Sequence, residues 1–333
     1  MPSRAPVHVV YGGAHLFRGE MAAKLSRLAL RAADEGGLEE LAGEEVAARV
    51  RDKPPREAVE DYRIDFEDGF GVRSDEEEDA AALSSARAVA GSGLPCVGIR
   101  IKSGWRRGER TLKLFLDAAG TLAVLTLPKV TSPAEVERAA RAAPGVPLEV
   151  MIETPEALRD ARAIVSAGPV AAAHFGPYDF TSSLGVPAAA QSLTHPLCDH
   201  ARHRLLIELA GTGVRISDGP TSTLPLGTRA EIRFGWQLHM VNVRHALASG
   251  IYQGWDLHPA QIPARLAALY AFYRENLAPG RERWINYREQ SAQATRVGQA
   301  FDDAATVRGL EIFFRRGLSC GALDESEIPD GLL

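Results

Sequence analysis

Acidic side chains follow apolar runs at several points of this chain, and their types and spacing suit chemistry at a metal ion. The segment Arg63–Gly71 places Asp65, Glu67 and Asp68 within four residues, directly after a strand-like run. In a strand, Asp65 and Glu67 share one face. Burying two like charges on one face is costly unless a cation or a tight hydrogen-bond network compensates them.

Two further strand-like runs also end on acids. The run Val150–Ile152 is followed directly by Glu153, and the run that begins at Ala172 leads to Asp179. Carboxylates from the ends of separate strands supply the oxygen ligands that hard cations such as Mg²⁺ prefer. The sequence therefore predicts a divalent cation where these strands end.

The elements that must position these acids follow a regular alternation of short apolar runs and helical patterns. The predicted strands are Val7–Ala14, Tyr62–Phe66, Cys96–Ile101, Leu122–Leu127, Leu148–Ile152, Val170–Phe175, Val214–Ser217 and Ile251–Leu257. The predicted helices between them are Gly19–Asp34, Glu76–Ala90, Thr111–Ala118, Pro133–Ala143, Pro155–Ala167, Pro196–Ala210 and Arg229–Ser249. Ser132 and Thr154 each precede a proline, which is typical of a helix start.

Eight strands alternating with helices favour a parallel sheet with helices outside it, and the count and length fit a closed (β/α)₈ TIM barrel. In such a barrel, catalytic groups lie at the C-terminal ends of strands, where the acids are found. An open doubly wound sheet would need a phosphate-binding glycine loop, and the sequence has neither GxGxxG nor GxxxxGK. We assign residues 1–262 to a barrel catalytic domain and residues 263–333 to a helical extension that packs on the barrel or on a neighbouring subunit.

Composition narrows the class of partner and compartment. The net charge of -5 leaves no basic excess to neutralise phosphates, so nucleic acid is not an expected partner. Cys96, Cys198 and Cys320 lie far apart without the spacing of a zinc site or disulfide framework, which fits a reducing compartment. The first apolar run is too short for a signal or membrane segment. We expect a cytoplasmic protein with no membrane partner.

Six motifs occur in an order that points to a known group. They are Val9–Ala14, Asp65–Asp68, Gly98–Ile101, Leu127–Val130, Ile152–Thr154 with Gly176–Asp179, and Leu257–Ile262. Their order resembles the citrate lyase β-subunit and malyl-CoA lyase group, and more broadly the metal-dependent hydroxy-oxo-acid aldolases. The resemblance implies a TIM barrel that binds Mg²⁺, or Mn²⁺ in its place, and assembles as a homotrimer or homohexamer.

The same resemblance implies roles for individual residues. Glu153 and Asp179 match the metal ligands, and Arg100 matches an arginine that contacts the substrate carboxylate or carbonyl oxygen, where we expect a two-pronged clamp. Glu67 and Asp68 match acids that hold metal-bound waters.

The remaining candidates surround these residues. Gly176, Pro177 and Tyr178 are the further substrate-binding candidates. For the general base two alternatives stay open, a water activated by Asp68, or Asp218 if its loop reaches a site.

The expected function is a Mg²⁺-dependent carbon–carbon lyase, an aldolase that acts on a small 2-oxo or 2-hydroxy acid through a metal-stabilised enolate. One alternative is an acyl-CoA lyase or thioesterase of the malyl-CoA or citramalyl-CoA type, with a CoA thioester as partner. No acid follows Asp218–Pro220 closely, which disfavours it. Another is a phosphoenolpyruvate-handling transferase with Arg106 and Arg107 as a phosphate clamp. For Lys129 we expect a structural salt bridge rather than a Schiff base.

Overall fold

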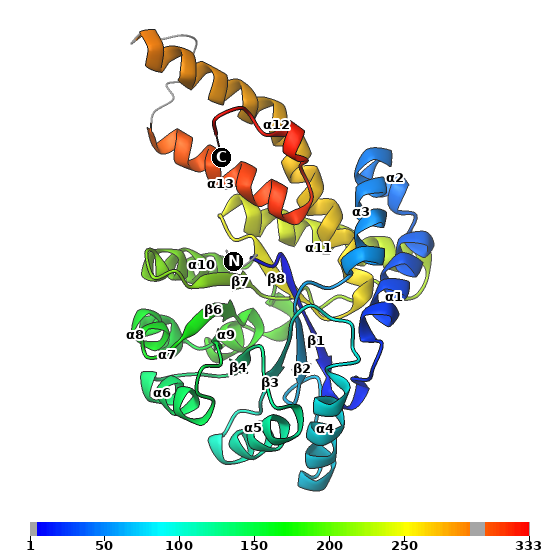
Figure 1. Cartoon of the computed structure of the whole chain (residues 1–333), viewed down its shortest axis with the longest axis vertical. Coiled ribbons are helices and arrows are strands. Elements are labelled where there is room, and N and C mark those ends of the chain that lie inside the picture. Colours follow the sequence, from blue (N-terminus) through cyan, green and yellow to red (C-terminus); the bar gives the residue numbers. More distant parts are fainter. Residues whose placement is uncertain (1–4, 294–303, 333) are drawn as a thin grey trace.

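The computed structural model of the chain describes residues 5–293 and 304–332, and its centre is a closed barrel of eight parallel strands (Figure 1). The strands pair in chain order, and β8 closes the barrel on β1. They are β1 His8–Gly13, β2 Tyr62–Asp65, β3 Val97–Arg100, β4 Leu125–Leu127, β5 Leu148–Ile152, β6 Val170–Phe175, β7 Arg215–Asp218 and β8 Gln253–Asp256. Every predicted strand overlaps one of these, so the predicted TIM barrel is confirmed.

Helices surround the barrel and join consecutive strands, as parallel pairing requires. They are α1 Met21–Gly36, α2 Leu38–Ala42, α3 Glu44–Glu57, α4 Asp75–Ala88, α5 Trp105–Ala119, α6 Pro133–Ala142, α7 Pro155–Arg159, α8 Ala161–Ser166, α9 Pro177–Ser183, α10 Pro196–Leu209, α11 Arg229–Ala248, α12 Ile262–Gln293 and α13 Ala304–Cys320. Each of the seven helices predicted between strands is present, although the one predicted over 155–167 is divided at Asp160 into α7 and α8. The helices α2, α3 and α9 were not predicted.

Local capping fixes several points where a loop turns into a helix. The Ser74 hydroxyl accepts a hydrogen bond from the backbone N–H of Glu77, and the Glu77 side chain accepts one from Ser74, so a capping box starts α4. The Thr154 hydroxyl accepts from the N–H of Ala157 at 3.1 Å and starts α7. Because Thr154 takes this role, the preceding Glu153 is not needed as a cap.

The inside of the barrel is filled by paired charges rather than by apolar side chains alone. Two nitrogens of Arg63 donate to the Glu149 carboxylate at 2.7 and 2.9 Å, and the Thr126 hydroxyl donates to it at 2.8 Å. His174 Nε2 lies 3.2 Å from the same carboxylate, and Trp255 donates to the other ring nitrogen of His174 at 2.7 Å. All five side chains are buried. Since β2, β4, β5, β6 and β8 each supply one of them, the network ties the strands together.

The last two helices leave the barrel on the side opposite the C-terminal ends of the strands (Figure 1). The first residues of α12 are buried and pack on α11 and α3, and the helix then continues through Pro279 beside α13. With 32 residues, α12 is about 48 Å long. The predicted boundary between residues 262 and 263 falls at the first residue of α12. That division into two domains stays a prediction. No helix in the described part of the chain is long and apolar enough to cross a bilayer.

Candidate active site at the C-terminal mouth of the barrel

Arg100 and Asp65 form the innermost pair of the mouth. They are register partners at the ends of β3 and β2. Arg100 Nε donates to Asp65 Oδ1 at 2.7 Å and Nη2 donates to Oδ2 at 2.5 Å, while Asp65 also accepts from the backbone N–H groups of Glu67 and Gly69. Asp65 thus binds the Nε–Nη2 edge of the guanidinium, and the predicted two-pronged contact of Arg100 with substrate stays a prediction. Nη1 is the nitrogen that Asp65 does not hold, and it lies 3.5 Å from Met151 Sδ.

The remaining nitrogen of Arg100 faces the two predicted acids that follow β2. Arg100 Nη1 lies 3.2 Å from Glu67 Oε2 and 3.5 Å from Asp68 Oδ2, and the guanidinium lies 5.0 Å from the centre of the Tyr11 ring. Glu67 is buried, and burial raises the pKa of its carboxyl. Asp68 is exposed to solvent. The structure thus brings Arg100, Glu67 and Asp68 together, one acid buried and the other open to a ligand.

Lys129 stands at the centre of the mouth, directly after β4 and Pro128. Its ammonium lies 3.0 Å from Glu67 Oε1, 3.9 Å from Asp68 Oδ1 and 4.0 Å from Asp179 Oδ2. Its backbone has a φ of +50°, an uncommon value for a residue with a side chain, and its N–H donates to Glu153 Oε1 at 2.6 Å. The predicted salt bridge is present.

The central position of Lys129 was missed by sequence reasoning. The signal was its place just after the predicted strand Leu122–Leu127, a position like that of Glu153 and of the acids after β2.

Glu153 and Asp179, the predicted metal ligands, come from neighbouring strands. Glu153 follows β5 and is 2% exposed, and Asp179 lies half-exposed in the first turn of α9. Burial, followed by the negative charge of Asp179, raises the pKa of Glu153 to about 7. The close approach depends on Gly176, where a Cβ atom would lie 2.6 Å from Glu153 Oε2. A buried carboxylate thus lies under the influence of a half-exposed one, an arrangement that favours a shared cation.

The other residues of the turn after β6 shape the mouth in different ways. Pro177 is the first residue of α9 and adjoins Gly176 beside Glu153. The Tyr178 hydroxyl donates to the carbonyl oxygen of Pro220 at 3.0 Å and accepts from the N–H of Ser222 at 3.1 Å. Tyr178 therefore fastens this turn to the loop after β7.

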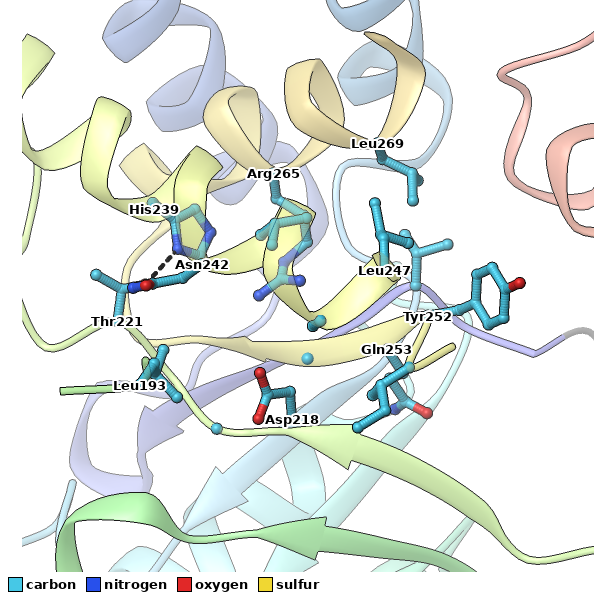
Figure 2. A pocket seen from close by; sticks show the side chains of 16 residues that line it. Leu193, Asp218, Thr221, His239, Asn242, Leu247, Tyr252, Gln253, Arg265 and Leu269 are labelled. Carbon is cyan, nitrogen blue, oxygen red and sulfur yellow. Dashed lines mark hydrogen bonds between the residues drawn. The ribbon is translucent and has the colours of Figure 1, made fainter. Parts of the chain in front are cut away.

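Asp218 is not part of this group. Its Oδ1 accepts from Arg202 Nε of α10 at 2.8 Å, on the helix-facing side of β7. Figure 2 shows it with His239 and Arg265 around a cavity of about 10 Å³, which has room for one water at most. Side chains alternate along a strand, and the neighbouring Ser217 takes the opposite face.

No ion pair or hydrogen bond within the described ranges links Asp218 to the acids of the mouth. The structure therefore does not support Asp218 as the general base within one subunit.

The charges of the mouth fit a divalent cation. The mouth holds five carboxylates and two cationic side chains. The carboxylates are those of Asp65, Glu67, Asp68, Glu153 and Asp179, and the cationic side chains are those of Arg100 and Lys129. Burial raises the pKa of Glu67 and of Glu153, and neighbouring acids add to the rise. Across residues 5–293 and 304–332, no group of three or more His, Cys, Asp or Glu side chains is arranged to hold a metal. A pair of carboxylates leaves most positions to water and substrate, as Mg²⁺ prefers.

Comparisons place the chain beside proteins of known fold. A family described as a domain of unknown function (DUF6986) matches residues 1–332, and no curated protein matches. A citrate lyase from Burkholderia xenovorans LB400 is 25% identical, with 98% of this chain and 96% of that chain covered and a TM-score of 0.68.

Two further solved structures share the fold. CitE from Mycobacterium tuberculosis, in complex with magnesium, acetoacetate and coenzyme A, is 19% identical, with 95% and 99% covered and a TM-score of 0.63. RipC from Yersinia pestis is 18% identical, with 78% and 93% covered and a TM-score of 0.54. The predicted resemblance to citrate lyase-like proteins is confirmed.

Proposed function

Since the chain belongs to the family described as a domain of unknown function (DUF6986), we propose its activity from the chemistry of the mouth. It is a Mg²⁺-dependent carbon–carbon lyase that acts on a small 2-oxo or 2-hydroxy acid. The observation that carries this proposal is the Glu153–Asp179 pair: burial of Glu153, and after it the negative charge of Asp179, raises the pKa of Glu153 to about 7. A divalent cation at the pair would offset that negative charge.

The similar structures support both the cation and the class of substrate. Those of the Mycobacterium tuberculosis protein hold magnesium together with acetoacetate, oxaloacetate or pyruvate, all of which are small oxo acids. When bound, Mg²⁺ supplies Lewis acidity that lowers the energy of an enolate next to a carbonyl. The proposed reaction breaks or forms a bond at the carbon beside that carbonyl.

The protein's own side chains would bind and orient the acid. Arg100 Nη1 is the one nitrogen of that guanidinium not bound to Asp65, and it offers a charged donor to the substrate carboxylate. Asp68 is exposed beside it and can accept a proton directly or through a water. Glu67, with a pKa raised by burial, holds Lys129 and Arg100 in place. We therefore assign proton transfer to Asp68 and positioning to Glu67.

An acyl-CoA lyase or thioesterase is the second candidate. A structure with coenzyme A covers 95% of this chain, which favours it. The loop after β7 has no acid between Thr221 and Pro225, and Asp218 is bound to Arg202, which disfavours it.

The structure does not favour the phosphoenolpyruvate-handling alternative, because the expected phosphate clamp of Arg106 and Arg107 is not available. Arg107 Nη2 donates to Asp79 at 2.9 Å, and Arg107 Nε lies 3.3 Å from Glu78, so these acids of α4 hold the side chain in place. Arg106 beside it is exposed. We do not propose this activity.

The test compares Glu153→Gln with the control Glu156→Gln, three residues away and exposed on α7. Calorimetric titration of metal-stripped protein with MgCl₂ is expected to give at least about 100-fold weaker binding for the first variant, since one of two charged ligands is lost. The control is expected to bind like the unsubstituted protein. Equal affinity in all three proteins would refute the assignment of the metal ligand.

Turnover then separates the two candidates. The Mg²⁺-loaded protein is offered 2-hydroxy acids and their CoA thioesters, and release of 2-oxo acid is followed. Cleavage of free acids supports the proposed lyase, whereas cleavage confined to thioesters selects the second candidate.

A further inference from the structure

A second cavity lies at the opposite end of the barrel from the acidic mouth. Its volume is about 220 Å³, and it is bounded by the end of α10, the first residues of β7 and β8, and α13. Arg215 and Gln253 open these two strands, so the cavity is at the amino ends of the strands. Figure 1 shows α13 on this side of the barrel. Nothing proposed above uses this cavity.

The lining of this cavity carries positive charge and no acid, whereas a larger cavity of about 580 Å³ that Arg215 also borders is lined by Glu60, Asp61 and Glu149. Arg215 and Arg316 both border the smaller of these two cavities, and none of the described residues that line it is acidic. The nearest carboxylate to Arg215 is Glu149, 4.0 Å from Nη2, and Glu149 is already bound by Arg63 and His174. Arg215 Nε is buried with no hydrogen-bond partner in the described ranges. This guanidinium therefore has unused donor capacity.

Arg316 presents a second guanidinium from α13. It lies 4.6 Å from the centre of the Tyr252 ring, a contact that fixes the side chain without neutralising it. Within residues 5–293 and 304–332 it forms no ion pair. Two guanidinium groups from distant parts of the chain thus face one cavity.

Gln253 adds an unsatisfied amide to this arrangement. It is 4% exposed, and neither its side-chain nitrogen nor its oxygen has a hydrogen-bond partner among the described residues. A buried polar group left without a partner costs about 1–3 kcal/mol, so such groups normally meet water or a ligand. Gln253 also borders the small cavity of Figure 2, but there its side chain is directed away from Arg265 and Asp218.

We propose that this cavity binds a small oxyanion, the phosphate or carboxylate group of a metabolite, through Arg215, Arg316 and the amide nitrogen of Gln253. Guanidinium groups bind both kinds of group through paired N–H donors, and the amide adds a neutral donor. Because Arg316 belongs to α13 and the other two residues to the barrel, a bound anion also joins α13 to the barrel.

The first test is calorimetric titration of the full-length, metal-free protein with sodium phosphate and, separately, sodium malonate, at constant ionic strength. Saturable binding is expected for at least one anion, and the one that binds identifies the class of group. Thermal melting should shift upward with the same anion, since a ligand of the folded state stabilises it. Absence of saturable binding for both anions would overturn the proposal.

Variants on α13 give the matched comparison. Arg316→Gln is expected to weaken binding at least about tenfold, because a charge-assisted contact is lost. Arg315→Gln removes the same charge from the exposed neighbouring residue, which does not line the cavity, and should bind like the unsubstituted protein. Equal weakening in both would show a general charge effect, and no weakening in Arg316→Gln would place the anion elsewhere.

A further pair of variants separates this site from the mouth. Gln253→Leu keeps the side chain buried and is expected to weaken anion binding while the protein still folds, as circular dichroism can verify. Glu153→Gln should leave anion binding unchanged, so failure of the proposed lyase activity would not alter this result. Anion binding that responds to Glu153→Gln and not to Gln253→Leu would contradict the proposal.

Discussion

At the scale of single residues, Lys129 contacts acids from several strands of the mouth, both through its backbone N–H and through its side-chain ammonium. Its backbone N–H holds Glu153, and its ammonium lies near Glu67, Asp68 and Asp179. Although burial opposes it, the charge of Glu67 raises the pKa of the ammonium, so it stays protonated. A fixed positive charge among these acids competes with any metal ion that binds there.

Lys129→Met should therefore bind Mg²⁺ more tightly, by about three- to tenfold, because one repelling charge is removed while the backbone N–H remains. Calorimetric titration with MgCl₂ measures the change. Lys113→Met, an exposed lysine of α5, removes the same charge far from the mouth and should leave the affinity unchanged. Weaker Mg²⁺ binding in Lys129→Met would show that the ammonium orders the ligands rather than opposing the metal.

The raised pKa of Glu153 makes the stability of the metal-free protein depend on pH. Its carboxyl titrates near pH 7 in the folded chain, against 4.5 ordinarily, so between these values the folded state binds a proton that the unfolded state has released. The free energy of unfolding therefore falls as pH rises from about 4.5 to 7, on the order of 3 kcal/mol in all.

The side chain of the Glu153→Gln variant cannot titrate, so its free energy of unfolding does not fall over this pH range for this reason. Melting temperatures of the two metal-free proteins are expected to diverge between pH 5 and pH 8, with the variant the more stable at pH 8. Parallel melting curves across that range would contradict the raised pKa of Glu153.

The residue types of the mouth were predictable, whereas their pairing was not. Arg100 ends a strand, and Glu67, Glu153 and Asp179 follow strands in the sequence, which places all four at one end of a parallel barrel. That Asp65 would occupy the Arg100 guanidinium depends on the register of β2 against β3, and a single sequence does not contain that register.

At the scale of elements, the turn from β6 to α9 sets the position of the metal-ligand pair. The N–H of Gly176 donates to the carbonyl oxygen of Ile152 at 3.0 Å, so the turn lies against the end of β5. A side chain at Gly176 would meet both Cβ and Oε2 of Glu153, at 2.5 and 2.6 Å. Contacts this short cannot form, so either the backbone at residue 176 or the Glu153 side chain would have to move.

Gly176→Ala should therefore displace Glu153 and weaken Mg²⁺ binding about tenfold or more, with a loss of about 1–3 kcal/mol in stability. The matched control is Gly19→Ala, where the nearest atom to an added Cβ would be 3.7 Å away. Mg²⁺ titration and thermal melting of both variants are the measurements. Unaltered Mg²⁺ affinity in Gly176→Ala would mean that Glu153 does not ligate the metal.

The missed helices have identifiable causes. The end of α3 contains Pro54 and Pro55, which argue against a helix interior in a sequence, although only the last turn is affected here. The seven-residue α9 carries Asp179 in its first turn and reads as a turn because Gly176 and Pro177 begin it. Short helices bury few residues, so they leave little periodicity to detect.

At the scale of the whole molecule, the fold buries charged side chains inside the barrel. Glu149 receives hydrogen bonds from Arg63 and Thr126 and lies beside His174, and these contacts hold the pKa of its carboxyl well below its usual range against the effect of burial. Removing one partner of such a buried ion pair destabilises the folded state, because the other charge is left buried without compensation.

Glu149→Gln is expected to lower stability by about 3–5 kcal/mol, because Arg63 keeps its charge in a buried site with one partner fewer. Thermal melting and urea unfolding measure the effect. Glu208→Gln changes the same charge on α10, where the carboxylate is half-buried and pairs with the exposed Arg204, and should shift stability by no more than about 0.5 kcal/mol. Comparable effects of the two substitutions would show that the buried network adds little to stability.

The architecture was the most predictable level, because eight apolar runs alternating with helices admit few folds. The homotrimer or homohexamer and the cytoplasmic location stay predictions, since they depend on surfaces and surroundings beyond one subunit. The projecting α12 and α13 were foreseen only as helices, because their packing depends on distant residues such as Tyr252 and Arg316.

The filled axis of the barrel also makes its two ends separate compartments. Val9, Tyr11, Met151 and Trp255 stack as an inner apolar layer, next to the ionic belt around Glu149. Within the described residues, these two layers fill the axis between the two ends of the barrel. A metabolite held under α13 would therefore contact β7 and β8 at their amino ends, and a displacement of these strands would carry its effect to the mouth.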